Sequence, residues 1–195
     1  VDQETEIGRA RVNSINQGIF PFTTSDQKII SALEEAKKIG NLVATTDESV
    51  YEDAEIVVVD VGLEIPYLDK EPQLQMEDFE NAVRSVCQRI QKGALLVIET
   101  TVPPGTCDRL VSPLLEKELQ KRGLEESSIH LAHSFERVMP GSNYLDSIVN
   151  FWRVYAGQTE AAADACEEFL TSIIDTDRFP LTRVSTTRGS ELAKV

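Results

Sequence analysis

The chain has 195 residues, of which 41% are hydrophobic, and its formal net charge is −14 at pH 7. This length can bury a core without disulfides, and the negative average potential disfavours nucleic acids and anionic membranes as partners. No apolar run approaches the ~20 residues that span a bilayer. Three widely spaced cysteines, Cys87, Cys107 and Cys166, are typical of a reducing compartment, so a cytoplasmic globular protein is expected.

Hydrophobic periodicity predicts helices and strands that alternate along the chain. Helices are predicted over residues 7–18, 25–40, 76–93, 106–122, 159–174 and from 186 onward. Strands or extended segments are predicted over residues 41–46, 54–61, 94–100, 129–134, 151–157 and 179–185. The β-branched segment 54–61 is typical of a strand that is covered on both faces. Each cysteine lies in a predicted helix, where a small buried side chain is expected.

This alternation implies βαβ units and therefore an α/β fold with a doubly wound, mostly parallel, Rossmann-like sheet. In such sheets ligands bind beyond the C-terminal ends of the strands. The phosphate-binding pattern GxGxxG is absent from the sequence, so the predicted dinucleotide-binding domain lacks its first strand and glycine-rich loop. Asp2 resembles the end of a strand, and the last helix stops within two turns. We therefore expect a piece of a longer enzyme.

Three predicted strand ends carry polar side chains that could bind a ligand. Asp2 could accept hydrogen bonds from the adenosine ribose of a dinucleotide, although an aspartate before a helix is also a good N-cap. Thr100 and Thr101 precede a Pro-Pro-Gly turn, and two hydroxyls there could hold a water or a nicotinamide amide. An ordinary strand-to-helix turn has the same composition, so both interpretations remain open.

The third strand end is the stretch LAHSFERVMPG, which starts as an apolar strand and ends in polar residues. Ser134, Glu136 and Arg137 are predicted to lie where a ligand would bind. Glu136 could act there as an acid, a base or a water-orienting group. The alternative is a surface Glu–Arg pair of little energetic weight. His130 and His133 are expected to be structural, and no metal site is predicted because no cysteine or carboxylate cluster accompanies them.

Taken together, these stretches resemble the nucleotide-sugar 6-dehydrogenases of the UDP-glucose/GDP-mannose dehydrogenase family. The resemblance rests on VNSINQGIFPF, AEIVVVDV, LLVIETTVPPGT, HSFERVMPG, RVYAG and STTRGSELAKV, which occur in the family's order. It implies a partial Rossmann-like NAD-binding domain over residues 1–184. Residues 185–195 would begin the central helix through which family members form homodimers. The implied reaction is the NAD-dependent oxidation of the primary alcohol of a nucleoside-diphosphate sugar to a carboxylate.

The resemblance also implies roles for individual residues. Asp2 would bind the adenosine ribose of NAD, and its charge would repel the 2′-phosphate of NADP. Thr100 and Thr101 would lie at the nicotinamide, and Thr101 would position a catalytic water. Glu136 would lie beside the cofactor and the substrate and take part in acid–base steps. Lys194 would stabilise the alkoxide-like oxygen as the hydride leaves.

The sequence departs from the family pattern at four positions. Phe135 stands where better-known members carry proline, and Asp60 stands where many end a strand in Val-Pro-Thr-Pro. Pro140 replaces the second glutamate of UDP-glucose dehydrogenases. Gly189 weakens the start of the helix that carries Lys194. These departures favour a divergent branch. Because the glycine-rich loop and the C-terminal domain with its nucleophilic cysteine are missing, we expect no turnover by the chain alone.

Two other classes of protein fit the same residues. β-Hydroxyacid dehydrogenases also pair a Rossmann-like domain with a lysine on a helix, and an all-helical C-terminal domain would select them. A non-catalytic module that binds a dinucleotide or a nucleotide sugar is permitted by the departures at Asp60 and Phe135. Binding of NAD and sugar without formation of NADH would select that module.

Overall fold

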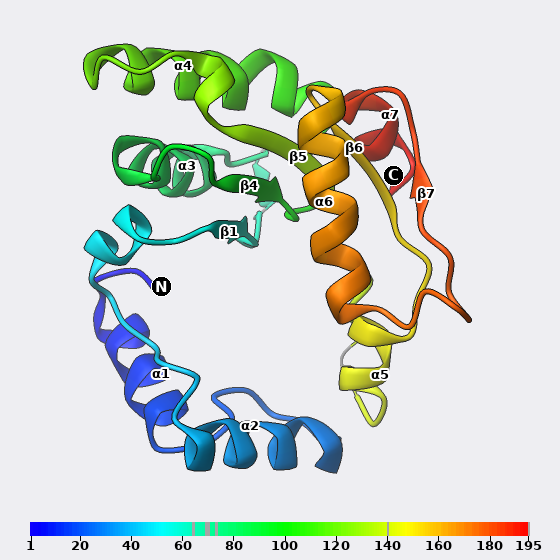
Figure 1. Cartoon of the computed structure of the whole chain (residues 1–195). Coiled ribbons are helices and arrows are strands. Elements are labelled where there is room, and N and C mark those ends of the chain that lie inside the picture. The colour runs from blue at the N-terminus through cyan, green and yellow to red at the C-terminus, as the bar shows by residue number, and fades with distance from the viewer. Residues whose placement is uncertain (64, 69–70, 73, 140, 195) are drawn as a thin grey trace. The chain divides into compact units, whose positions relative to one another are not determined.

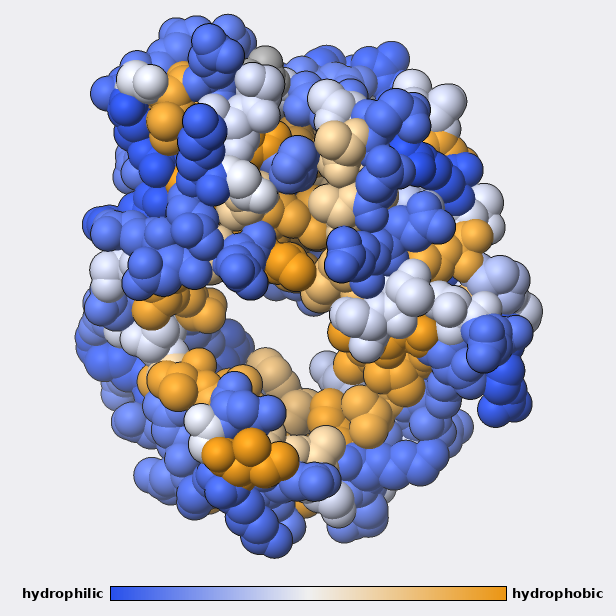
Figure 2. Space-filling model, in the orientation of Figure 1, coloured by the Kyte–Doolittle hydropathy of each residue, from blue (hydrophilic) through white to orange (hydrophobic). Residues whose placement is uncertain are grey.

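The structure is a computed structural model that describes residues 1–63, 65–68, 71–72, 74–139 and 141–194 (Figure 1). The chain forms two compact units. The first comprises Val1–Ser49 and Arg137–Phe151, and the second comprises Val50–Glu136 and Trp152–Val195. Within the described residues, no helix combines the length and the apolarity needed to cross a membrane. On the face shown in Figure 2, hydrophilic residues dominate the surface, which agrees with the net charge of −14.

The described residues of the first unit form the α-helices α1 (Glu6–Asn16), α2 (Gln27–Ile39) and α5 (Tyr144–Val149). Thr5 caps α1, so the alternative role of Asp2 as its N-cap is wrong. Asp26 caps α2, and its second carboxylate oxygen accepts a hydrogen bond of 2.8 Å from the Leu145 amide in α5. Gly40, at a φ of 77°, ends α2 in the left-handed conformation that glycine adopts without strain. The two helices predicted in this region are therefore confirmed.

The strand predicted over residues 41–46 is wrong, since none of these residues, all of which the structure describes, belongs to a strand. The amide side chain of Asn16 instead binds the backbone N–H and C=O of Ala44, at 2.8 and 2.9 Å. The Thr45 carbonyl accepts a hydrogen bond of 2.9 Å from the Asp2 amide. A β-propensity becomes a strand only when a neighbouring strand completes the ladder, and no described segment does so here.

The second unit is built on a five-stranded sheet in the order β1-β4-β5-β6-β7. Its strands are β1 (Ile56–Val59), β4 (Leu95–Ile98), β5 (His130–Ser134), β6 (Val154–Gly157) and β7 (Thr182–Arg183). All neighbouring strands run parallel except the antiparallel pair β5 and β6. The predicted α/β class with a mostly parallel sheet is confirmed.

Helices connect several of these strands, and a last helix follows β7. They are α3 (Glu77–Arg89), α4 (Ser112–Lys121), which continues a π-helical turn at Cys107–Val111, α6 (Glu160–Ile173) and α7 (Thr187–Leu192). Short 3₁₀ turns lie at Glu48–Glu52 and Glu126–Ser128, and the two-residue strands β2 (Tyr67–Leu68) and β3 (Glu71–Pro72) pair in an antiparallel arrangement. The predicted helices are confirmed, although α3 ends four residues before Gly93. The three cysteines are buried and unbridged, as expected.

The core lies on both faces of the sheet because side chains alternate along each strand. Leu96 and Ile98 of β4 pack in the cluster that holds α3 and α4, whereas Leu95 and Val97 pack in the cluster that holds α6. In β1 only one face is covered, since Ile56 and Val58 are 44% and 37% exposed. The prediction of a doubly covered strand is therefore wrong for β1, which is the outermost strand of the described sheet.

Candidate active site

A pocket of about 420 Å³ lies in the second unit, beyond the C-terminal ends of β1, β4 and β5. Its lining consists of Asp60, Val61, Gly62, Leu63, Ile65, Leu74, Thr100, Thr101, Val102, Pro103 and Glu136. Three of the predicted site residues, Thr100, Thr101 and Glu136, therefore lie around one pocket. This is the edge of a parallel sheet at which ligands of such folds bind.

The two threonines after β4 differ in their surroundings. Thr100 is 3% exposed, and its hydroxyl donates to the Val59 carbonyl and accepts from the Val61 amide, at 3.3 and 2.8 Å. This hydroxyl thus joins the ends of β1 and β4 and is already hydrogen-bonded within the protein. Thr101 is exposed at the pocket. A polar group of a ligand therefore meets Thr101 more readily than Thr100.

Glu191 fixes the turn that follows these threonines. Its side chain is 1% exposed, and its two oxygens accept hydrogen bonds from the backbone amides of Gly105 and Cys107, the latter at 2.8 Å. These amides begin the π-helical turn and α4, so they are among the donors that a helix start leaves unpaired. A carboxylate at that position is also favoured by the helix dipole. Glu191 therefore attaches α7 to the pocket wall.

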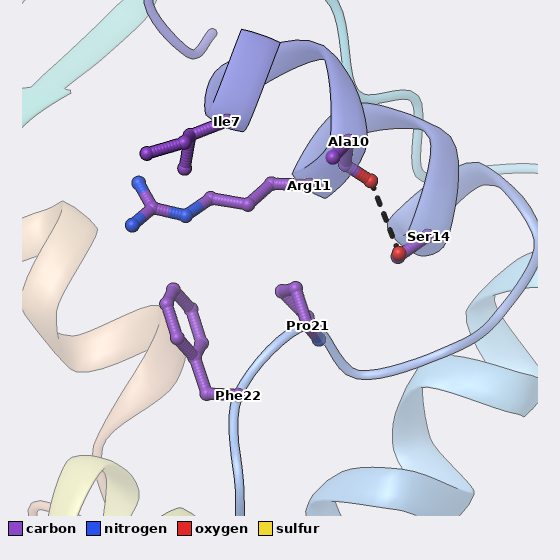
Figure 3. Close-up of a pocket in the computed structure, with 6 residues that line it drawn as sticks. All are labelled: Ile7, Ala10, Arg11, Ser14, Pro21 and Phe22. Atoms are coloured by element: carbon purple, nitrogen blue, oxygen red, sulfur yellow. Dashed lines mark hydrogen bonds between the residues drawn. The ribbon is translucent and has the colours of Figure 1, made fainter.

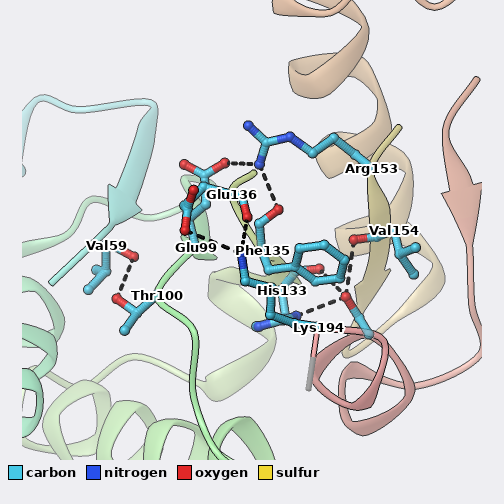
Figure 4. A network of polar contacts seen from close by, with 10 residues as sticks. Val59, Glu99, Thr100, His133, Phe135, Glu136, Arg153, Val154 and Lys194 are labelled. Atoms are coloured by element: carbon cyan, nitrogen blue, oxygen red, sulfur yellow. Dashed lines mark hydrogen bonds and ion pairs between the residues drawn. The ribbon is translucent and has the colours of Figure 1, made fainter. Parts of the chain in front are cut away.

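The helix that precedes Lys194 forms in spite of Gly189. Thr186 caps α7 through a hydrogen bond of 3.1 Å from the Gly189 amide. Lys194 follows α7, and its Nζ donates to the Glu136 carbonyl at 2.7 Å and lies 3.4 Å from Glu136 Oε1 (Figure 4). The fold thus brings together two predicted site residues that are 58 positions apart in the chain.

Phe135 lies directly under the Lys194 ammonium. The Nζ atom is 5.4 Å from the centroid of its ring, which is within the range of a cation–π contact. The Phe135 side chain is 2% exposed, and its carbonyl accepts a hydrogen bond of 2.7 Å from Arg153. The residue that departs from the family pattern therefore packs against the predicted catalytic lysine.

The sequence reasoning missed one buried ion pair at this site. Arg153 is 1% exposed, and its Nη1 lies 2.5 Å from Oε1 of Glu99 (Figure 4). Burial raises the pKa of Glu99, Arg153 opposes this shift, and the carboxylates of Asp60 and Glu136 add to it. A glutamate at the end of a buried strand and an arginine just before another could have indicated the pair, because buried charges are rarely left without partners.

Ser134 and Arg137, the other predicted ligand-binding residues of the stretch LAHSFERVMPG, are not among the residues that line the pocket. Ser134 is fully buried in β5 and does not line the pocket, so its predicted place at a ligand is wrong. Arg137 belongs to the first unit, where its guanidinium lies 4.8 Å from the ring centroid of Phe151. Pro140 lies outside the described residues.

His133 is a buried neutral residue that links β5 to α7. Its Nδ1 lies 2.8 Å from the Ser190 hydroxyl, and its side chain has no measurable exposure. Burial lowers the pKa of His133 from its ordinary 6.5 to about 4. The expectation of a structural histidine agrees with this environment. Among the described residues, no group of three or more histidine, cysteine or acidic side chains is arranged to hold a metal ion.

This histidine predicts a specific loss of stability in acid. Between pH 6.5 and about 4 the unfolded chain binds a proton at His133 that the folded chain does not bind. The free energy of unfolding should therefore fall by about 3 kcal/mol as the pH drops through this window, and His133→Gln should lose that part of the pH dependence. Urea unfolding at several pH values measures the free energy of unfolding of the unmodified protein and of His133→Gln. Parallel curves for the two proteins would contradict the assignment.

Asp2 belongs to the first unit, whereas the residues that line the pocket belong to the second. Its Oδ1 accepts a hydrogen bond of 2.8 Å from the Gln3 amide, and its Oδ2 lies 3.7 Å from the Arg11 guanidinium. Arg11 also lies 5.3 Å from the ring centroid of Phe22 and lines a second pocket of about 370 Å³ (Figure 3). The other residues of that pocket are Ile7, Ala10, Ser14, Pro21 and Phe22.

Comparison with known proteins relates this chain to one family. The family model described as the NAD binding domain of the UDP-glucose/GDP-mannose dehydrogenase family matches residues 4–174. UDP-N-acetyl-D-mannosamine dehydrogenase of Pyrococcus horikoshii is 30% identical over 164 residues, which are 84% of this chain and 37% of that protein. The enzyme of the same name from Escherichia coli K12 is 27% identical over 194 residues, which are 97% of this chain and 43% of that protein. The chain thus spans less than half of these relatives.

Solved structures show the same fold. NDP-N-acetyl-D-galactosaminuronic acid dehydrogenase from Methanosarcina mazei superposes with a TM-score of 0.87 at 22% identity, over 99% of this chain and 39% of that one. The UDP-D-ManNAc dehydrogenase of Pyrococcus horikoshii superposes with a TM-score of 0.78 at 27% identity, over 95% of this chain and 41% of that one. Because the family model matches most of the length of this chain, the chain belongs to the UDP-glucose/GDP-mannose dehydrogenase family and corresponds to that family's NAD-binding domain.

Proposed function

We propose that the complete protein containing this chain oxidises the primary alcohol of a nucleoside-diphosphate sugar to a carboxylate. One observation carries the proposal, namely that Thr101, Glu136 and Lys194 gather at the ligand-binding edge of the sheet. Thr101 and Glu136 line the pocket, and the Lys194 ammonium is held by the backbone and the carboxylate of Glu136. The match to the NAD-binding domain and the relatives that act on UDP-N-acetyl sugars support the same reaction class.

The pocket fits the nicotinamide end of NAD. Ile65, Leu74 and Val102 supply apolar surface for a flat ring, and the Thr101 hydroxyl is available for its amide. When bound, NAD supplies the hydride acceptor of the oxidation. Asp2, in the first unit, is the proposed partner of the adenosine ribose, although its carboxylate now lies near Arg11.

The protein's own groups would stabilise charge and orient water. Lys194 carries a positive charge next to the place where an alcohol oxygen becomes anionic, and an ammonium already held in position stabilises that charge without reorganising. Glu136 keeps the ammonium in place through its carbonyl and could exchange protons through its carboxylate. Thr101 and Glu136 line the same pocket and would orient the water needed for the carboxylate product.

The larger assembly is also part of the proposal. Residues 1–184 would form the partial cofactor domain, and the helix that starts near residue 185 would continue into the dimerisation helix of a cytoplasmic homodimer. The cysteine that completes the second oxidation would come from a C-terminal domain outside this chain. Among the described residues, all three cysteines are buried and their pKa values are raised by burial, so they are poor nucleophiles.

Spectrophotometry of the complete protein with NAD and a panel of UDP- and GDP-sugars tests the proposal. We expect two NADH per sugar oxidised for at least one sugar of the panel, and no NADH with the 195-residue chain alone. Oxidation of a β-hydroxyacid in place of every sugar would select the other dehydrogenase class. Binding of NAD and sugar by calorimetry, without any NADH, would select a non-catalytic module.

A further inference from the structure

Asp60 is an unpaired carboxylate at the pocket. It directly follows β1 and lines the pocket together with Thr101 and Glu136. The structure shows neither a hydrogen bond nor an ion pair between the Asp60 side chain and any residue that it describes. Neighbouring atoms partly desolvate this carboxylate, but Asp60 keeps access to solvent at the pocket, whereas Arg153 is 1% exposed.

The charges around Asp60 are otherwise matched. Arg153 pairs with Glu99 at 2.5 Å, and Lys194 pairs with Glu136 at 3.4 Å. Two cations thus compensate two of the three carboxylates, and one negative charge is left over at Asp60. The pKa of Asp60 is raised, first by burial among its neighbours and then by the Glu136 carboxylate, in spite of Arg153 and Lys194. The negative charge of Asp60 is therefore not compensated by a cation of the protein, and a positively charged ligand could compensate it.

The two forms of the proposed cofactor differ by one positive charge. The oxidised nicotinamide ring is a cation and the reduced ring is neutral, whereas the pyrophosphate and the adenosine are the same in both. We propose that Asp60 makes this pocket select the oxidised cofactor over the reduced one. This inference rests on the proposed function, because it requires the nicotinamide ring to bind in the pocket that Asp60 lines.

Such selection would serve a two-step oxidation. Each step leaves a reduced cofactor that must be exchanged for an oxidised one before the next step. A carboxylate within a few ångströms attracts a cationic ring and leaves a neutral ring unaffected, so it favours the exchange in the required direction.

Dissociation constants of NAD⁺ and NADH for the complete protein test the inference. Asp60→Asn removes the charge and keeps the shape. It should reduce the preference for NAD⁺ about tenfold, mainly through weaker binding of NAD⁺. Asp53→Asn, an equal change at an exposed aspartate outside the pocket, should leave the preference unchanged. Asp60→Ser is a second neutral variant, and melting curves show which variants are folded.

The outcomes separate the inference from the proposed function. If unmodified protein and both neutral variants bind the two cofactor forms with the same ratio of constants, the inference is overturned and the proposed function stands. The same holds if Asp53→Asn changes the ratio as much as Asp60→Asn, because the effect would then be one of net charge. Failure of the unmodified protein to bind either form contradicts the proposed function, and the inference with it.

Discussion

Lys194→Ala is expected to lower the turnover number of the complete protein by about 10²–10³-fold while leaving the dissociation constant of NAD near its original value. The ammonium lies at the Glu136 carbonyl and over the Phe135 ring, and in the proposed mechanism it faces the substrate alcohol. An alcohol becomes a carbonyl by losing its hydroxyl proton as well as a hydride. As the proton leaves, the oxygen gains anionic character, and a preformed cation nearby lowers the energy of that state. Removal of the cation should therefore affect the chemical step more than cofactor binding.

Steady-state kinetics and calorimetry with NAD measure the two parts of this prediction. Lys92→Ala, at an exposed lysine of the same unit, is the matched control and should be as active as the unmodified protein. Circular dichroism and a melting curve establish that each variant is folded. Near-normal turnover in Lys194→Ala would remove Lys194 from the proposed mechanism.

Arg153→Met is expected to lower the free energy of unfolding by about 3–5 kcal/mol, the usual effect of removing one partner from a buried ion pair. Arg153 is 1% exposed and binds both Glu99 and the Phe135 carbonyl, at 2.5 and 2.7 Å. Without it, the carboxylate of Glu99 remains half-buried near Asp60 and Glu136, and no other cation among the described residues lies at hydrogen-bonding distance. Its pKa, already raised by burial, should rise further. Urea unfolding followed by circular dichroism measures the loss.

A second substitution should recover part of this loss. Arg153→Met combined with Glu99→Gln removes the uncompensated charge, so the double variant should be more stable than Arg153→Met alone. Arg188→Met breaks a surface pair with Asp108, at 3.3 Å, and should cost less than about 1 kcal/mol. If the double variant is less stable than Arg153→Met, electrostatic repulsion among the carboxylates does not explain the loss.

The sequence by itself determined the fold class, the family and the edge of the sheet that carries the site. These follow from local patterns, since an apolar run such as LLVI is typical of a strand buried in a sheet, and parallel strands end at a common edge. For this reason Thr101 and Glu136, each just after an apolar strand, could be placed near one another before the structure was known. The family could be inferred because its motifs are short local stretches of sequence that occur in the same order in this chain.

Only the tertiary structure decided how these side chains are held. Arg153 and Glu99 are 54 positions apart, and Lys194 and Glu136 are 58 apart, so their contacts depend on how strands and helices cross rather than on any local period. The Phe135 ring under Lys194 and the unpaired Asp60 likewise become visible only in three dimensions. Residues 41–46 and the exposed face of β1 differ from prediction because pairing and coverage are supplied by neighbours that a local pattern does not contain.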